Sequence, residues 1–291
     1  MSVGKSIRIY LADGTVTGIR HGEIVNWTGQ AVMLPRKRFS ELKDWEEASK
    51  PGIYILFGED DVSGEQMAYI GESENVYDRL RNHVDRKEFW NEAILFTNKD
   101  ENLTKAHAKY LESRLILFAN NASRYTVENG TAPPLPKLPR GDRDAMDEFF
   151  ENLRLLLGAL GHKLLEPVIE KNIEGETIET VNALNITMTR SGLTAKGQLT
   201  DEGVVVLPGS QATSNVRPSL SEGYRKLRQR LIDSGVLELA GDDYIFTKEY
   251  LFSSPSAAGA MLCGQACNGR EYWKDNQGRT IKQLEELSEN Q

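Results

Sequence analysis

Several features that define common protein classes are missing from this sequence of 291 residues. It has two cysteines, Cys263 and Cys267, which are too few for a disulfide framework. No apolar run approaches the roughly 20 residues that cross a bilayer, and the N-terminus lacks the pattern of a signal peptide. We therefore expect a cytoplasmic protein that does not act in a membrane. Because three residues separate the cysteines and no histidine is near, we expect core thiols rather than metal ligands.

An excess of positive charge is also missing. The formal net charge is -8, and residues 1–130 hold 17 Lys and Arg against 20 Asp and Glu. Such a balance argues against a protein that coats nucleic acid, but it permits an enzyme with local, metal-assisted contacts. The hydrophobic share of 39% and the charged share of 27% are typical of a globular protein. The length favours two domains.

What the sequence does contain is centred on residues 52–112. Two short apolar runs, residues 52–57 and 67–71, predict antiparallel strands joined by a polar loop. The sequence Ser73-Glu74-Asn75 can cap a following helix. Every fourth residue of that helix is apolar, and a second stripe at the same interval holds Asn75, Arg79 and His83. We expect the helix to bury one face and to present the arginine and the histidine together on another.

A third strand, residues 94–97, is followed by a long helix that runs through Phe118. Glu112 lies beside the inward-facing leucines of that helix. A carboxylate at the edge of an apolar face is costly unless it is paired or holds a cation. Glu112 is therefore either a cation ligand or the partner of Lys105 or Lys109 on its own helix.

Together these residues resemble those of the GIY-YIG nuclease family. Gly52-Ile53-Tyr54 and Tyr69-Ile70-Gly71 match the two halves of its signature, here separated by fourteen residues. Arg79 stands where the family has an arginine, eight positions after the second half. His83 stands where many members have a histidine, and Glu112 where a metal-binding glutamate is expected. The resemblance covers roughly residues 50 to 130 and implies an α+β fold with a small three-stranded antiparallel sheet flanked by helices.

Two further positions compare differently with the family pattern. Members of the family often have a basic residue directly after the second half of the signature, whereas this chain has Glu72. Many members also have an asparagine that orients the metal site. Asn129 is the candidate for that role, and Asn121 is the alternative.

The chemistry that the resemblance implies is metal-dependent phosphodiester hydrolysis. Glu112 offers a hard oxygen ligand suited to Mg²⁺ or Mn²⁺. Arg79 offers a permanent planar charge for phosphate. Either Tyr54 or Tyr69 can take a proton from water if its pKa falls from its usual value of about 10, and in the family a signature tyrosine usually has that role. His83 can act as a base or can orient one.

The rest of the chain suggests three parts. We assign residues 1–131 to the nuclease-like domain, which begins with a β-hairpin around Asp13-Gly14. Residues 132–182 contain a proline-rich linker, a helix at 144–160 and a polar connector. We expect that helix to connect two domains, with a dimer surface as the alternative. Residues 183–291 predict a smaller α+β domain. It resembles an uncharacterised accessory domain fused behind GIY-YIG nucleases in prokaryotes.

One basic cluster stands out in the C-terminal domain. It can form a phosphate-contacting face with a stacking aromatic, or it can be an ordinary charged helix face beside a core tryptophan. Its members are Arg217, Arg225, Lys226, Arg228 and Arg230, with Trp273 and Lys274.

These observations lead us to expect an endonuclease that uses Mg²⁺ or Mn²⁺ and acts on DNA. One alternative is a nucleic-acid-binding module that no longer cuts. The other is a nuclease that processes RNA.

Overall fold

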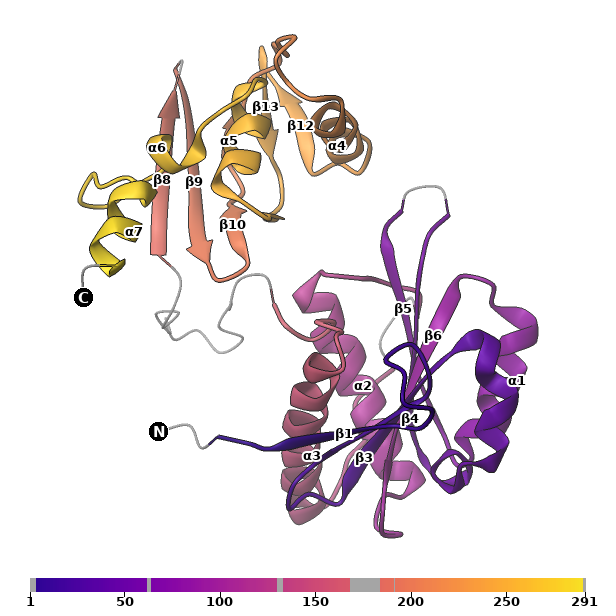
Figure 1. Cartoon of the computed structure of the whole chain (residues 1–291). Helices are drawn as coiled ribbons and strands as arrows, with labels where there is room; N and C mark the ends of the chain where they lie inside the picture. Colours follow the sequence, from indigo (N-terminus) through magenta and orange to yellow (C-terminus); the bar gives the residue numbers. More distant parts are fainter. Residues whose placement is uncertain (1–3, 62–63, 130–132, 168–183, 191, 290–291) are drawn as a thin grey trace. The chain divides into compact units, whose positions relative to one another are not determined.

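The chain forms two compact units, residues 1–167 and 168–291 (Figure 1). The computed structural model describes residues 4–61, 64–129, 133–167, 184–190 and 192–289. Within those ranges, no helix is both long and apolar enough to cross a membrane.

The first unit is built on a seven-stranded sheet with the order β1-β2-β3-β6-β4-β5-β7. All neighbouring strands are antiparallel except β5 and β7. The strands are β1 (Ile7–Leu11), β2 (Arg20–Ile24), β3 (Gly29–Pro35), β4 (Gly52–Glu59), β5 (Gln66–Ser73), β6 (Trp90–Asn98) and β7 (Thr126–Val127). The α-helices are α1 (Val76–Arg86), α2 (Lys105–Ala122) and α3 (Arg140–Ala159), and two short 3₁₀ helices are η1 (Arg36–Asp44) and η2 (Glu46–Ser49).

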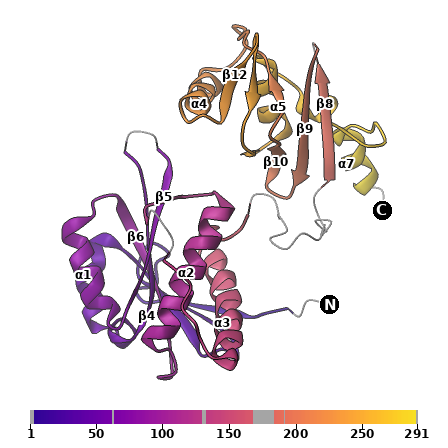
Figure 2. The same ribbon diagram turned by 180° about the vertical axis from the view of Figure 1, so that it is seen from behind.

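Both faces of the central strands are covered, which explains why β4 is an unbroken apolar run. Tyr54 and Leu56 point into a core shared with α1. Ile53 and Ile55 point the opposite way, into a core shared with α2 and α3. Figures 1 and 2 show α1 on one side of the sheet and α2 with α3 on the other.

The α+β class is confirmed, but the first sheet is wider than the three strands expected. The expected strands are β4, β5 and β6, and β3 pairs with the free edge of β6 from Gly29 opposite Asn98 to Pro35 opposite Glu92. The N-terminal hairpin is therefore not a separate appendage, because β2 and β1 extend the same sheet. An unpaired β6 would expose a long row of backbone N–H and C=O groups, and β3 satisfies them.

The helix expected to connect two domains instead belongs to the first unit. Phe149, Phe150, Leu153 and Leu156 of α3 lie in the same core as the sheet. The first unit accordingly extends to Pro167 rather than ending at residue 131. A broad apolar helix face must be buried, and the nearest uncovered surface is the sheet itself. The polar connector, residues 168–182, lies outside the described residues.

The second unit is a smaller α+β domain, as expected. One sheet has the order β14-β10-β9-β8-β15, and a second has the order β11-β13-β12. The strands are β8 (Leu184–Arg190), β9 (Leu193–Thr200), β10 (Gly203–Val206), β11 (Gln211–Ala212), β12 (Leu237–Ala240), β13 (Asp243–Phe246), β14 (Tyr250–Phe252) and β15 (Lys274–Asp275). The helices are α4 (Glu222–Asp233), α5 (Pro255–Cys263), α6 (Gly269–Tyr272) and α7 (Ile281–Glu289). Within this unit, α4 lies at one end and α7 at the other (Figures 1 and 2).

Candidate active site

A hydrogen-bonded chain of three side chains links β4 to α1. The hydroxyl of Tyr54 lies 2.8 Å from Nε2 of His83 and accepts a hydrogen bond from Nε of Arg79 at 3.3 Å. The phenol oxygen has two lone pairs and one proton, so it can accept from Arg79 and also hydrogen-bond to His83, with the tautomer of His83 deciding which of those two groups donates. Tyr54 thus joins Arg79 and His83 through its hydroxyl group.

The helix that carries Arg79 and His83 begins as the sequence predicts. The side chain of Asn75 caps α1 by accepting a hydrogen bond from the backbone N–H of Asp78 at 3.1 Å. Arg79 and His83 are four residues apart, so both face Tyr54. Burial lowers the pKa of His83 to about 4, and the charge of Arg79 adds to that effect. The lowered pKa favours the neutral imidazole at pH 7.

Gly71, which ends the signature, leaves space for the hydroxyl of Tyr54. Tyr54 lies directly opposite Gly71 in the β4–β5 pairing. A Cβ atom at Gly71 would lie 2.2 Å from the Tyr54 hydroxyl, which is too short for any contact between non-bonded atoms. Gly52 has a similar constraint, because its Cβ would lie 2.3 Å from the carbonyl oxygen of Phe96. These two signature glycines are thus required by close approach rather than by unusual backbone angles.

The two signature tyrosines have different environments. Tyr54 is fully buried, and burial raises its pKa. Tyr69 is only partly buried, and its ring lies 5.2 Å from that of His83. The ammonium of Lys87 sits 4.2 Å from the centre of the Tyr69 ring. The structure therefore makes Tyr54 an internal link and leaves Tyr69 as the tyrosine nearer to solvent.

Two carboxylates come together where β5 meets α2. Glu112 is partly buried on α2 and accepts a hydrogen bond from the backbone N–H of Glu72. Burial and then the charge of Glu72 raise the pKa of Glu112, while Arg79 and Lys109 act in the opposite direction. Oε2 of Glu72 is buried, and no group among the residues that the structure describes hydrogen-bonds to it. Lys105, the other lysine expected as a partner for Glu112, pairs instead with Glu74 at 2.9 Å.

This carboxylate pair suits a hard divalent cation. An unpartnered buried carboxylate oxygen and a carboxyl group with a raised pKa both gain from a nearby positive charge. In the part of the chain that the structure describes, no group of three or more His, Cys, Asp or Glu side chains is placed to hold a metal. Mg²⁺ commonly uses one or two carboxylates and keeps water and substrate oxygens, so Glu72 and Glu112 are a sufficient protein contribution.

The sequence did not indicate a metal-binding role for Glu72, which stood out only because family members often have a basic residue there. The signal that could have found it is strand alternation, because Ala68, Ile70 and Glu72 share one face of β5. That face meets α2, the helix that carries Glu112.

Asn129 has a structural role next to the signature. Its side-chain oxygen accepts from the backbone N–H of Ile70 at 2.8 Å, and its side-chain nitrogen donates to the carbonyl of Ile70 at 2.6 Å. These bonds continue the pairing of β5 with β7, so Asn129 holds β5 in place just before Gly71 and Glu72. Asn121, the alternative, is exposed on α2.

The basic cluster of the second unit does not form one surface. Arg228 is buried, and its guanidinium donates hydrogen bonds to the carbonyls of Met261, at 2.5 Å, and Thr213. Trp273 is also buried, and its indole N–H donates to the carbonyl of Pro255 at 3.2 Å. Arg228 therefore joins internal elements, and Trp273 is a core residue that cannot stack on a base.

The remaining cations of the cluster are exposed, but they lie on separate parts of the second unit. Arg225 donates to the carbonyls of Leu220 and Arg217, and Lys226 pairs with Glu222 on its own helix. Lys274 belongs to β15, which pairs with β8 at the opposite end of the unit from α4. Arg217 and Arg230 are likewise exposed, in the loop before α4 and on α4.

Comparison with known proteins identifies the second unit only. No GIY-YIG family model matches the chain, so the nuclease resemblance rests on the residues and geometry of the first unit. No curated protein and no solved structure matches it either. Residues 184–285 match the family described as "Domain of unknown function (DUF4357)". The second unit is thus similar to the DUF4357 family.

Proposed function

We propose that the first unit is a metal-dependent endonuclease of the GIY-YIG type that hydrolyses phosphodiester bonds in DNA. The observation that carries the proposal is the hydrogen-bonded chain of Arg79, Tyr54 and His83 beside the carboxylates of Glu72 and Glu112. A purely structural role explains Glu72 poorly, because a buried carboxylate oxygen without a partner costs stability.

Glu112 and Glu72 would hold the Mg²⁺ or Mn²⁺ ion. When bound, such an ion polarises the phosphate and favours departure of the leaving oxygen. Arg79 is exposed, and its charge acts on Glu112, so the guanidinium lies near enough to the ion site to meet the same phosphate. Its planar fork suits phosphate oxygens, whose negative charge increases in the transition state.

Tyr69 is the better candidate for taking the proton of the attacking water. Tyr54 is buried, and its hydroxyl is already bonded to His83 and Arg79. Tyr69 is partly exposed, Lys87 lies over its ring, and Arg79 is a neighbour of its hydroxyl. In this arrangement Tyr54 and His83 position Arg79, and they do not contact substrate.

The test is a cleavage assay with supercoiled, branched and single-stranded DNA and with RNA, in Mg²⁺ or Mn²⁺. We expect the wild-type chain to cut DNA and Tyr69→Phe to be severely impaired. Arg79→Lys keeps the charge but loses the fork, so we expect its rate to fall roughly 100-fold or more, with a smaller loss of binding. Arg81→Lys is the matched control, because Arg81 is exposed on another face of α1.

Each other outcome points to a different function. Cleavage of RNA but not of DNA would make the protein an RNA-processing nuclease. Binding of nucleic acid without cleavage in either metal would make it a silent binding module.

A further inference from the structure

The second unit brings the chain's two cysteines together. Cys263 is the last residue of α5, and Gly264 turns the chain there with a φ of 61°. The turn returns Cys267 to the side of α5, so that a Cβ atom at Gly259 would lie 2.8 Å from the Cys267 sulfur. Both cysteines are partly buried, and their side chains are hydrogen-bonded to each other. Two thiols in contact across a glycine turn are placed to react with one another.

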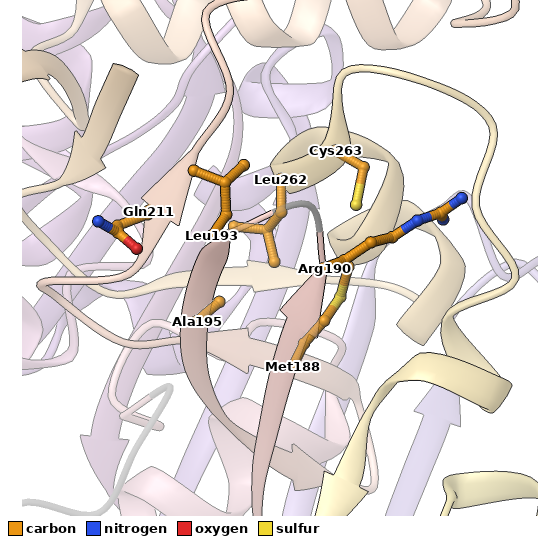
Figure 3. A pocket seen from close by; sticks show the side chains of 7 residues that line it. All are labelled: Met188, Arg190, Leu193, Ala195, Gln211, Leu262 and Cys263. Atoms are coloured by element: carbon orange, nitrogen blue, oxygen red, sulfur yellow. The ribbon is translucent and has the colours of Figure 1, made fainter. Parts of the chain in front are cut away.

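A cation accompanies the pair. Arg190, at the end of β8, donates from Nη1 to the Cys267 sulfur at 3.3 Å. Its guanidinium also lies 4.2 Å from the centre of the Tyr272 ring, which restricts its position. Figure 3 shows Arg190 and Cys263 on one side of a pocket that also has the apolar side chains of Met188 and Leu262 in its lining. Cys263 therefore lines this pocket, while Cys267 is bonded to Arg190 and is itself partly exposed.

The environment distinguishes the two thiols. The hydrogen bond from Cys263, and then the charge of Arg190, lower the pKa of Cys267 against the effect of burial. The same hydrogen bond and burial raise the pKa of Cys263. Since the thiolate is the nucleophile, Cys267 is the thiol that reacts first. An oxidant-sensing cysteine typically has this thiolate character and a second cysteine beside it.

We propose that Cys267 and Cys263 form a redox-sensitive dithiol that is oxidised by hydroperoxides. In the first step the Cys267 thiolate attacks the terminal peroxide oxygen. An S–O bond forms, the O–O bond breaks, and the departing alkoxide or hydroxide takes up a proton. In the second step the sulfur of Cys263 attacks the Cys267 sulfenic acid. An S–S bond forms, the S–O bond breaks, and the hydroxyl leaves as water with the thiol proton of Cys263. The two thiols lose two electrons, which the peroxide gains.

Because the chain has no other cysteine, its total thiol content reports this site alone. We expect one equivalent of hydrogen peroxide to remove both thiols from the full chain. The product should be monomeric on a non-reducing gel and lighter by two hydrogens. Cys263→Ser should stop at a sulfenic acid that a dimedone probe traps, and Cys267→Ser should keep its thiol. Arg190→Gln should slow alkylation of the wild-type pair by iodoacetamide at pH 7 by up to about tenfold, which corresponds to one pKa unit.

Lys196→Gln is the matched control for Arg190, since Lys196 is an exposed cation on the neighbouring strand β9. Measuring the alkylation rate as a function of pH shows whether Arg190 lowers the pKa of Cys267 or only supports the fold. Loss of a merely structural arginine would not move the midpoint of the rate–pH curve to higher pH. Three results would overturn the proposal: thiols that survive excess peroxide, equal oxidation in Cys267→Ser, or a disulfide between two chains.

Discussion

Replacing Gly71 with alanine should disrupt the candidate site from within the sheet. The added methyl would lie 2.2 Å from the Tyr54 hydroxyl, whereas ordinary contact begins at 3.4 Å. The ring of Tyr54 must therefore move by about 1.2 Å. Overpacking of this kind costs about 1–3 kcal/mol. The displaced hydroxyl would also lose its bonds to His83 and Arg79, worth about 1 kcal/mol each. We expect Gly71→Ala to lower the free energy of unfolding of the first unit by about 3–5 kcal/mol.

The assay is urea unfolding of the full chain, with Gly158→Ala as the matched control. Gly158 lies in α3 and has open space where a Cβ would be, so its replacement should stabilise the first unit by about 0.5–1 kcal/mol. The transition that the control moves to higher urea identifies the first unit. Under conditions where Gly71→Ala is still folded, it should also cut DNA more slowly, because Arg79 is no longer held. If Gly71→Ala proves as mild as Gly158→Ala, the tight contact with Tyr54 does not exist.

Three further predictions concern charge. The folded state favours neutral His83, whose pKa is about 4 against an ordinary value of 6.5, so the free energy of unfolding should fall as the pH drops from 6.5 to about 4. In thermal unfolding at several pH values, His83→Asn should show a weaker dependence on pH. Arg228→Ala removes a buried side chain that donates to the carbonyls of Met261 and Thr213, and it should destabilise the second unit by about 2–4 kcal/mol, whereas Lys226→Ala should change its stability by less than about 0.5 kcal/mol in chemical unfolding. The pKa of Glu112 is raised, so its charge opposes folding above pH 4.5, and Glu112→Gln should raise the melting temperature of the metal-free chain at pH 7. At a Mn²⁺ concentration of a hundred times the dissociation constant, the ion should stabilise the wild-type chain by about 2.7 kcal/mol. In the same melting experiment Mn²⁺ should not stabilise Glu112→Gln, and it should raise the melting temperature of Glu72→Gln by less than that of the wild type.

Local patterns in the sequence predicted much of the candidate site. The four-residue interval placed Arg79 and His83 on one face of α1, where both meet Tyr54. The apolar runs predicted the paired strands β4 and β5 with their signature residues on adjacent strands. These features depend on helix and strand periods, which any stretch of sequence displays without knowledge of its neighbours.

Features that depend on tertiary packing were harder to predict. The sequence does not say that β3 pairs with β6 or that α3 covers the sheet, because both follow from competition for one uncovered surface. Arg228 looked like part of a charged helix face. It falls between Leu227 and Leu231 on the inward side of α4, and its charge is accepted there by carbonyls from distant segments. Composition shows how many charges a helix has, but only packing shows which of them are buried.

Single-turnover cleavage of a supercoiled plasmid in Mg²⁺ by the wild-type chain and by Glu112→Gln tests the proposed site most directly. Glu101→Gln is the control, because Glu101 is an exposed carboxylate just before α2. Nuclease activity at this site predicts that wild-type and Glu101→Gln chains cut at equal rates, while Glu112→Gln remains folded, binds the plasmid and leaves it uncut. A Glu112→Gln chain that cuts at the wild-type rate would contradict this account, and so would a wild-type chain that cuts no phosphodiester bond.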